Sequence, residues 1–181
     1  MLTLNYSTYK MMNQEPIISK DGTFLPEQVG NIFLEAAKKE GKDITPMQLL
    51  KLVYIAHGWS LALFNRPLVN EPIRAWEFGP VIPSLYFLVR NYLDRPITGN
   101  LYHFVDQQED GYKLLNALVQ KVWKNYKGYN GIQLSALTHK SGTPWDKIFN
   151  SPNPGAGKNT VIPDSLIQEH YTSRLTVATP S

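Results

Sequence analysis

The chain has 181 residues, 43% of them hydrophobic and 18% charged, which suits one globular domain and excludes wholesale disorder. It contains no cysteine, which excludes disulfides, a thiolate nucleophile and cysteine-ligated zinc. The net charge is +3, yet the 18 Lys and Arg are scattered and do not form the cluster typical of a nucleic-acid-binding face.

The sequence shows neither a membrane span nor an export signal. No stretch reaches the roughly 18 uninterrupted apolar residues that a span needs. The first residues lack the basic start and apolar run of a signal peptide. We therefore expect a soluble, cytoplasmic protein.

In chain order, residues 1–24 have no clear period and are predicted to form an extended arm that precedes the domain. A helix is predicted from Pro26, because proline suits a first helical turn, and Gly41 is expected to end it. The next predicted helix spans 46–64. Thr45 and Gln48 fit a capping box before it, and its apolar residues cover most faces. It should therefore be the buried central helix.

After a break at 65–67, residues 68–76 are predicted to be extended, because Pro72 excludes a helix interior. Gly79 and Pro80 are expected to form a turn, and Pro83 to start a helix that runs to about residue 93. Further helices are predicted over 112–126, 131–138, from 144, and over about 163–173. The helix from 144 repeats the Thr-Pro start, with Thr143 at the cap and Asp146 at the third helical position. Residues 150–162 are predicted to form a flexible Pro/Gly connector, and 174–181 a tail.

The predicted fold is therefore mainly α: one compact helical domain, 25–173, around a buried central helix at about 46–64, with one short extended or β segment at about 68–76.

Candidates for catalysis or metal binding are few. The four histidines include no pair at helical metal-binding spacing. His57 lies on an apolar side of the central helix, and we expect it to be buried and hydrogen-bonded to a carbonyl or carboxylate, since no nucleophile is in context for it to serve as a base. The stretch 155–160 (GAGKNT) departs from a phosphate-binding loop, because Asn159 follows the lysine and no buried strand precedes it.

Glu77 is unusual because Trp76 and Phe78 flank it in the stretch AWEFGPVIPSLY. A carboxylate is costly to bury unpaired, so Glu77 should either pair within the domain or be the polar centre of an aromatic recognition patch. The candidate partners are Arg74, His57 and His139. We expect Trp76, Phe78 and Tyr86 to pack against the core.

Three stretches together resemble the Panacea domain, also called the SocA-like antitoxin domain: LLKLVYIAHGWSLALFNRPL (49–68), AWEFGPVIPSLY (75–86) and LSALTHKSGTPW (134–145). Their order and spacing match three motifs of that family, and the resemblance spans roughly residues 26–172. The matching residues are Lys51, Leu52, Tyr54, Ala56, Trp59, Trp76, Gly79, Pro80, Val81, Pro83, Tyr86, Leu134, Leu137, Thr138, His139, Pro144 and Trp145.

The resemblance implies an antitoxin that neutralises a toxin encoded beside it by direct binding, or as an adaptor that delivers the toxin to a cellular protease. Neither mode needs a catalytic residue, a cofactor or a metal, so we expect no enzyme activity. The alternatives are a nucleic-acid-binding regulator, although no helix-turn-helix is evident, and an enzyme that uses Glu77, His57 and His139 as an acid–base cluster.

The residues expected at a partner-binding surface or in its motifs are Trp76, Glu77, Phe78, Gly79, Pro80, Ser84, His139, Trp145 and Asp146. Those expected to support the fold are Thr45, Gln48, Tyr54, His57, Trp59, Pro83 and Tyr86.

Overall fold

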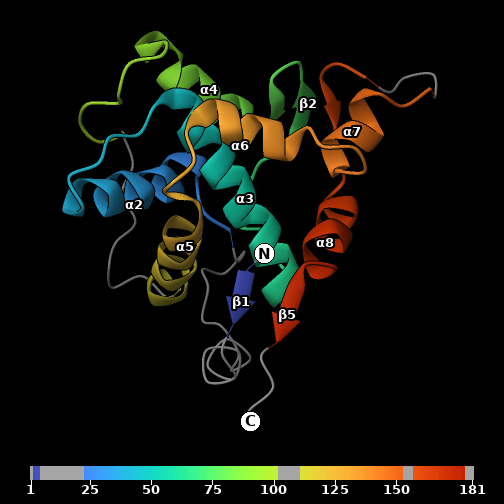
Figure 1. Cartoon of the computed structure of the whole chain (residues 1–181), viewed down its shortest axis with the longest axis horizontal. Helices are drawn as coiled ribbons and strands as arrows, with labels where there is room; N and C mark the ends of the chain where they lie inside the picture. Colours follow the sequence, from blue (N-terminus) through green and yellow to red (C-terminus); the bar gives the residue numbers. More distant parts are fainter. Residues whose placement is uncertain (1, 5–22, 102–110, 153–156, 178–181) are drawn as a thin grey trace.

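The computed structural model describes residues 2–4, 23–101, 111–152 and 157–177, and this part of the chain is mainly helical (Figure 1). Its elements in chain order are β1 (Leu2–Leu4), α2 (Pro26–Lys39), α3 (Pro46–Phe64), β2 (Arg74–Trp76), β3 (Gly79–Val81), α4 (Pro83–Val89), the 3₁₀ helix η1 (Arg90–Tyr92), α5 (Tyr112–Tyr126), α6 (Gly131–Thr138), α7 (Pro144–Phe149), β4 (Thr160–Val161), α8 (Asp164–Thr172) and β5 (Leu175–Val177).

Helix α3 is the centre of the fold, as predicted. It contacts α2, α4, α5, α6, α8 and strand β3, and Figure 1 shows it running through the middle of the molecule. By length and hydropathy α3 could cross a membrane, but 78% of its apolar window is buried inside the fold. A helix that is apolar on all sides must be covered on all sides in water, and the surrounding helices provide that cover.

Helix α2 starts at Pro26 and ends beside Gly41, also as predicted. Gly41 has φ +64°, and the N–H groups of Gly41 and Lys42 bond the carbonyls of Lys38 and Ala37. These two bonds form a Schellman motif, which needs the left-handed conformation that glycine adopts easily.

Two Thr-Pro pairs start helices, but only one caps as expected. Thr143 Oγ1 accepts from the Asp146 N–H at 3.3 Å and donates to Thr138 O. The predicted capping box at Thr45 is wrong, since its side chain makes no cap bond. Gln48 instead donates across the fold to Tyr129 O, so tertiary contact takes the amide that local capping would have used.

We expect Thr143→Ala to lower the free energy of unfolding by about 1–2 kcal/mol, since it removes an N-cap bond and a buried donor. Thr45→Ala is the matched control, because Thr45 occupies the same Thr-Pro position without a cap bond. Urea unfolding of both variants measures the difference. Equal losses would show that the Thr143 side chain contributes no capping energy.

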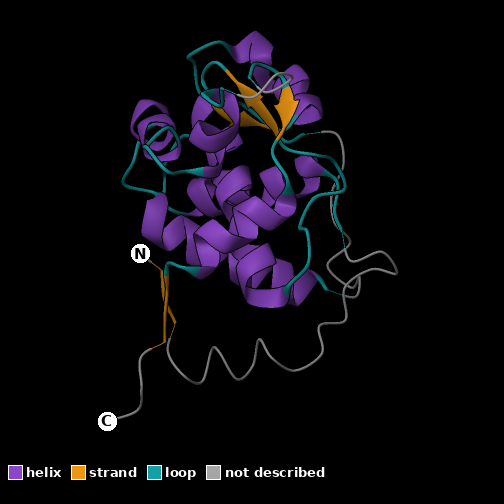
Figure 2. Ribbon diagram, turned by 90° about the vertical axis from the view of Figure 1, so that its right-hand side faces the viewer, coloured by secondary structure: helices purple, strands orange, loops and turns teal. Residues whose placement is uncertain are grey.

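A small antiparallel sheet, in the order β3-β2-β4, lies at one end of the helical body (Figure 2). Trp76 pairs with Gly79, so the turn of the β2–β3 hairpin is made by Glu77 and Phe78. The predicted turn at Gly79 and Pro80 is therefore wrong, because these residues open strand β3. Proline is tolerated there because β3 is an edge strand.

The predicted extended segment 68–76 is a strand only over Arg74–Trp76, and Val69 makes an isolated bridge with Phe24. The predicted connector at 150–162 is wrong for its last part, since Thr160–Val161 forms β4 against β2. Asn159, with φ +67°, leads into this strand and donates its N–H to Ala75 O at 2.6 Å. Residues 153–156 of that connector lie outside the described part of the chain.

The two ends of the described chain meet in a parallel pair, β1 with β5, on the side of the helical body opposite the small sheet (Figure 2). These strands belong to the predicted arm (1–24) and tail (174–181). Residues 5–22 and 178–181 are not among the described residues, so the domain boundaries at 25 and 173 stay a prediction.

Helices α3 and α8 pack very closely where Gly58 faces Tyr171. A Cβ on Gly58 would lie 2.2 Å from the Tyr171 ring. Two of the predicted supporting residues surround the same ring edge-on, Trp59 at 5.1 Å and Tyr54 at 6.2 Å between centroids. All four are buried, so the contact is part of the core.

Candidate functional site

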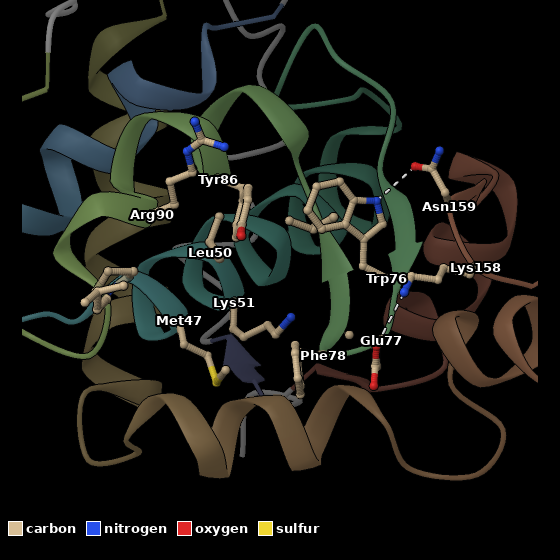
Figure 3. Close-up of a pocket in the computed structure, with 14 residues that line it drawn as sticks. Met47, Leu50, Lys51, Trp76, Glu77, Phe78, Tyr86, Arg90, Lys158 and Asn159 are labelled. Atoms are coloured by element: carbon tan, nitrogen blue, oxygen red, sulfur yellow. Dashed lines mark hydrogen bonds and ion pairs between the residues drawn. The ribbon is translucent and has the colours of Figure 1, made fainter.

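A groove of about 860 Å³ opens between the start of α3, the β2–β3 hairpin and the α4–η1 segment (Figure 3). Most of its lining is apolar, which is typical of binding sites in proteins. The lining residues, called the groove from here on, are Pro46, Met47, Leu50, Lys51, Trp76, Glu77, Phe78, Gly79, Val81, Tyr86, Arg90, Leu93, Lys158 and Asn159.

One wall of the groove is an aromatic cluster. Trp76 and Tyr86 meet edge-to-face at 5.0 Å, Phe87 lies 5.5 Å from Tyr86, and the Arg90 guanidinium lies 5.0 Å from the Phe87 ring. The indole N–H of Trp76 donates to Asn159 Oδ1 at 2.9 Å, as the dashed line in Figure 3 marks. These contacts hold Trp76 in one orientation and confirm the packing role expected for Trp76 and Tyr86.

The rim of the groove carries large apolar side chains that face solvent. Phe78 is 68% exposed and Leu93 is 72% exposed. The prediction that Phe78 packs into the core is wrong, because it sits at the tip of the hairpin, beyond the reach of the core. Leu93 has φ +56° and ψ −113°, which is a costly backbone conformation for a residue with a Cβ.

Glu77 is exposed at the hairpin tip, with its side chain 64% accessible. Its partner is Lys158, with 3.5 Å between Nζ and Oε2, and an exposed pair of this kind contributes at most about 1 kcal/mol. The three predicted partners of the Glu77 side chain are wrong. Arg74 donates to Asn159 O and His57 contacts Asp164. His139 contacts Glu77 through the backbone oxygen and not through the carboxylate.

Lys51 is the unexpected member of the groove. It is 3% exposed and donates to Pro80 O at 2.9 Å. Among the described residues no carboxylate lies within 4 Å of its ammonium group. Burial therefore lowers the pKa of Lys51 to about 7, because the loss of hydration disfavours the charged form.

Side chains from α3, α6 and α7 hold the hairpin by its carbonyl groups. Trp145 Nε1 donates to Trp76 O at 2.7 Å, and His139 Nε2 lies 3.2 Å from Glu77 O. Ser135 Oγ donates at 3.1 Å to the next carbonyl along the hairpin, Phe78 O. With Lys51 on Pro80 O, nearly every residue of the tip is fixed, so the groove wall is preorganised. His139 and Trp145, predicted at a partner surface, lie behind the hairpin as its supports.

Ser84 and Asp146, also predicted at the surface, belong to helix starts. The N–H of Ser84, which follows Pro83 in α4, donates to Glu71 Oε1 at 3.1 Å. Asp146 accepts from Asn150 and from the Gly142 N–H, and these bonds lower the pKa of its carboxyl group. Neither residue lines the groove.

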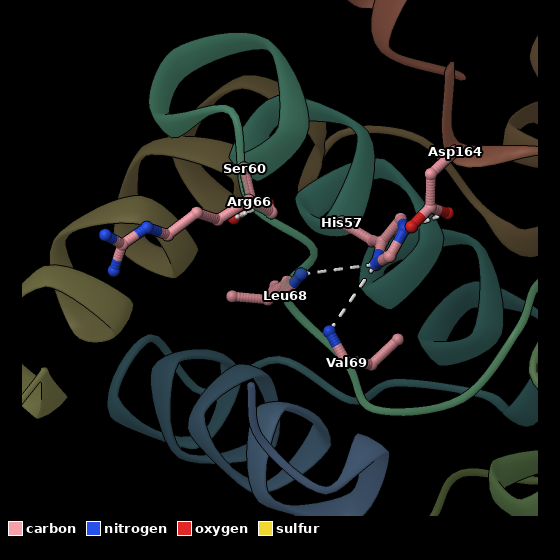
Figure 4. A network of polar contacts seen from close by, with 6 residues as sticks. All are labelled: His57, Ser60, Arg66, Leu68, Val69 and Asp164. Atoms are coloured by element: carbon pink, nitrogen blue, oxygen red, sulfur yellow. Dashed lines mark hydrogen bonds and ion pairs between the residues drawn. The ribbon is translucent and has the colours of Figure 1, made fainter. Parts of the chain in front are cut away.

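The predicted acid–base cluster of Glu77, His57 and His139 does not assemble. Figure 4 shows His57 inside the fold, with Nδ1 accepting from the N–H groups of Leu68 and Val69 and Nε2 3.1 Å from Asp164 Oδ1. A ring nitrogen that accepts from backbone N–H carries no proton, so His57 donates from Nε2 to the carboxylate. This confirms the buried, hydrogen-bonded role expected for His57.

Comparison with known proteins gives the family. Residues 49–146 match the family described as "Antitoxin SocA-like, Panacea domain". The chain belongs to the Panacea family of SocA-like antitoxins. A curated relative, "Antitoxin SocA" of Caulobacter vibrioides (strain NA1000 / CB15N), is 30% identical over 162 residues, which cover 84% of this chain and 85% of that protein. No solved structure matches the chain.

The geometry explains why the Panacea motifs occur together. The first motif contributes Lys51, the second the hairpin, and the third His139 and Trp145. These three side chains contact the carbonyl groups of Pro80, Glu77 and Trp76 in the hairpin. The motifs thus build the wall of the groove rather than an exposed catalytic cluster.

Several groove residues were not predicted as site residues. They are Pro46, Met47, Leu50, Lys51, Val81, Arg90, Leu93, Lys158 and Asn159. One signal was available: Lys51 is the single Asp, Glu, Lys or Arg in the stretch 46–64, so burial of that helix implied burial of a charge. Lys158 and Asn159 reach the groove only because β4 pairs with β2.

Proposed function

We propose that this chain neutralises a toxin encoded beside it by direct protein–protein binding, and that the toxin is covered through contact with the groove. Membership of the SocA-like antitoxin family implies a cognate toxin as partner. The proposed mode is occlusion in the cytoplasm, without catalysis by the antitoxin and without a cofactor.

The observation that carries this proposal is the exposed apolar rim beside a preformed aromatic wall. Exposed Phe87 packs beside Trp76 and Tyr86, and exposed Phe78 and Leu93 line the same groove as these two rings. A surface of this kind is costly in water and is typical of protein interaction sites, where aromatic residues and arginine dominate the binding energy. The hairpin supports reduce the ordering that binding requires.

The test is growth rescue with the product of the adjacent open reading frame. That product, expressed alone from an inducible promoter, is expected to stop growth, and co-expression of this chain is expected to restore it. Phe78→Asp with Leu93→Asp should abolish rescue, because both side chains are exposed and a charge at each would have to be desolvated on binding. A harmless neighbour would contradict the proposal.

The matched control is Ala117→Asp with Gln120→Asp, which adds the same two charges on exposed positions of α5, away from the groove. This control should keep full rescue, and both double variants should keep the wild-type circular dichroism spectrum. If the two pairs rescue equally, the groove is not the docking surface.

Toxin abundance separates occlusion from delivery to a protease. Under occlusion, the neighbour's product accumulates as a complex with this chain at a level similar to that of the product alone. An adaptor would instead lower its abundance, and loss of the protease would restore it. An immunoblot during rescue measures this directly.

A further inference from the structure

Within the described residues, the buried amine of Lys51 has no carboxylate partner of the kind that a charge in a protein interior normally has. Its Nζ donates to Pro80 O, which leaves an ammonium group with further donors and, in the described chain, no carboxylate within 4 Å. Buried charges are ordinarily paired, since removing one from water costs several kcal/mol. This interior amine can therefore pair with an anion that a binding partner supplies.

Lys51 also faces the groove and not the closed core. Figure 3 shows its side chain between Met47 and Phe78, with the amine directed towards the hairpin. Gly79 leaves room for the amine against the hairpin: a Cβ at position 79 would lie 2.6 Å from Lys51 Nζ, and the φ of +105° there suits glycine. The amine thus ends at the floor of an apolar groove.

The charges of the lining favour an acidic occupant. Arg90 and Lys158 are cationic, and Lys51 becomes cationic when it binds a proton. Glu77 is the one carboxylate among the lining residues and is already paired with Lys158. An apolar groove with excess positive charge complements a segment that carries a carboxylate between apolar side chains. A purely apolar segment would leave the ammonium group buried and unpaired.

We propose that the groove binds an Asp or Glu side chain of the toxin, flanked by apolar residues, and that this carboxylate pairs with Lys51. This inference rests on the proposed function and names the contact through which it acts. The apolar neighbours of the acid contact Phe78, Trp76 and Leu93, while the carboxylate completes the hydrogen bonding of the ammonium group. Lys158, exposed at the rim, serves only as a peripheral charge.

The experiment uses the full chain and the purified product of the adjacent reading frame. Lys51→Met should weaken binding at least about 30-fold, since loss of one partner of a buried charge pair costs that much or more. Lys124→Met is the matched control and should change the Kd less than about threefold, because Lys124 is exposed on α5, away from the groove. In the wild-type complex, carbodiimide should join Lys51 Nζ to an acidic side chain of the partner as an amide, identified by mass spectrometry.

Each outcome bears on the inference. Unchanged binding by Lys51→Met, or cross-links that involve only Lys158 and other surface lysines, overturns it while leaving the proposed function intact. If Lys51→Met does not fold, the cross-linked acid of the partner is changed to its amide and tested with the wild-type chain, where the same loss is expected and unchanged binding overturns the inference. Failure of the two wild-type proteins to bind at all instead removes the proposed function.

Discussion

Replacing Lys51 with methionine is expected to make the free protein more stable at pH 6, with a gain that shrinks as the pH rises. The pKa of Lys51 is about 7 in the folded protein against an ordinary value of 10.5. The unfolded chain therefore binds more protons than the folded protein between pH 7 and 10.5, so wild-type stability rises with pH across that window. Below pH 7 the full penalty applies, on the order of 5 kcal/mol.

Methionine removes this penalty but leaves Pro80 O without its donor, which costs about 1–3 kcal/mol at every pH. Urea unfolding at pH 6, 7, 8 and 9 should show the stability difference between variant and wild type falling by about 1.4 kcal/mol per pH unit above pH 7. The Lys158→Met difference should stay flat, because that side chain is 71% exposed. A flat Lys51→Met difference would show that the folded protein stabilises the charge, and a partner carboxylate would then be unnecessary.

This result would separate a structural lysine from a binding lysine. A side chain that weakens the free protein and strengthens a complex is retained for binding, since stability alone would select an apolar residue there. Together with the loss of affinity expected for the same variant, a gain in stability would place Lys51 in the second class.

The second large effect is expected at the contact between α3 and α8. Gly58→Ala should lower the free energy of unfolding by about 2 kcal/mol or more, because its Cβ would lie 2.2–2.7 Å from three atoms of the Tyr171 ring. Alanine would gain about 1 kcal/mol in an isolated helix, but the overlap with a buried ring costs more than this gain. Thermal unfolding should show Tm lower by about 4–8 °C.

Gly128→Ala is the control, since no atom of the described residues, apart from the adjoining chain, lies within 4 Å of a Cβ built there. It should be close to neutral. A double-mutant cycle with Tyr171→Leu tests the mechanism: Gly58→Ala should cost less in that background, because the obstructing ring is gone. Equal costs in both backgrounds would mean that the loss does not come from the ring.

Local sequence was sufficient wherever one segment carried its own physical reason. The apolar residues on all sides of 46–64 required a central helix, Gly41 ended α2, and Thr143 capped α7, because each depends on residues a few positions apart. The buried role of His57 followed from its apolar surroundings in the same helix.

Tertiary structure decided those contacts for which a distant residue competes with a neighbour in the sequence. Gln48 does not form the predicted capping box and instead donates to Tyr129 O. Glu77 pairs with Lys158, which is distant in sequence. The turn was predicted at Gly79 and Pro80 but is formed by Glu77 and Phe78. The pairing of β3 with β2 sets this register and outweighs the local preference of glycine and proline for turns.

The groove depends on both the sequence motifs and the tertiary structure. The three family motifs were readable in the sequence, and they indicated an antitoxin of this family. Their shared task was not readable, because the bonds from Lys51, His139 and Trp145 to the hairpin carbonyls join side chains to backbone atoms many residues away. A sequence pattern records which side chains are present, whereas the exposure of Phe78 and the burial of Lys51 depend on how the helices and the hairpin pack.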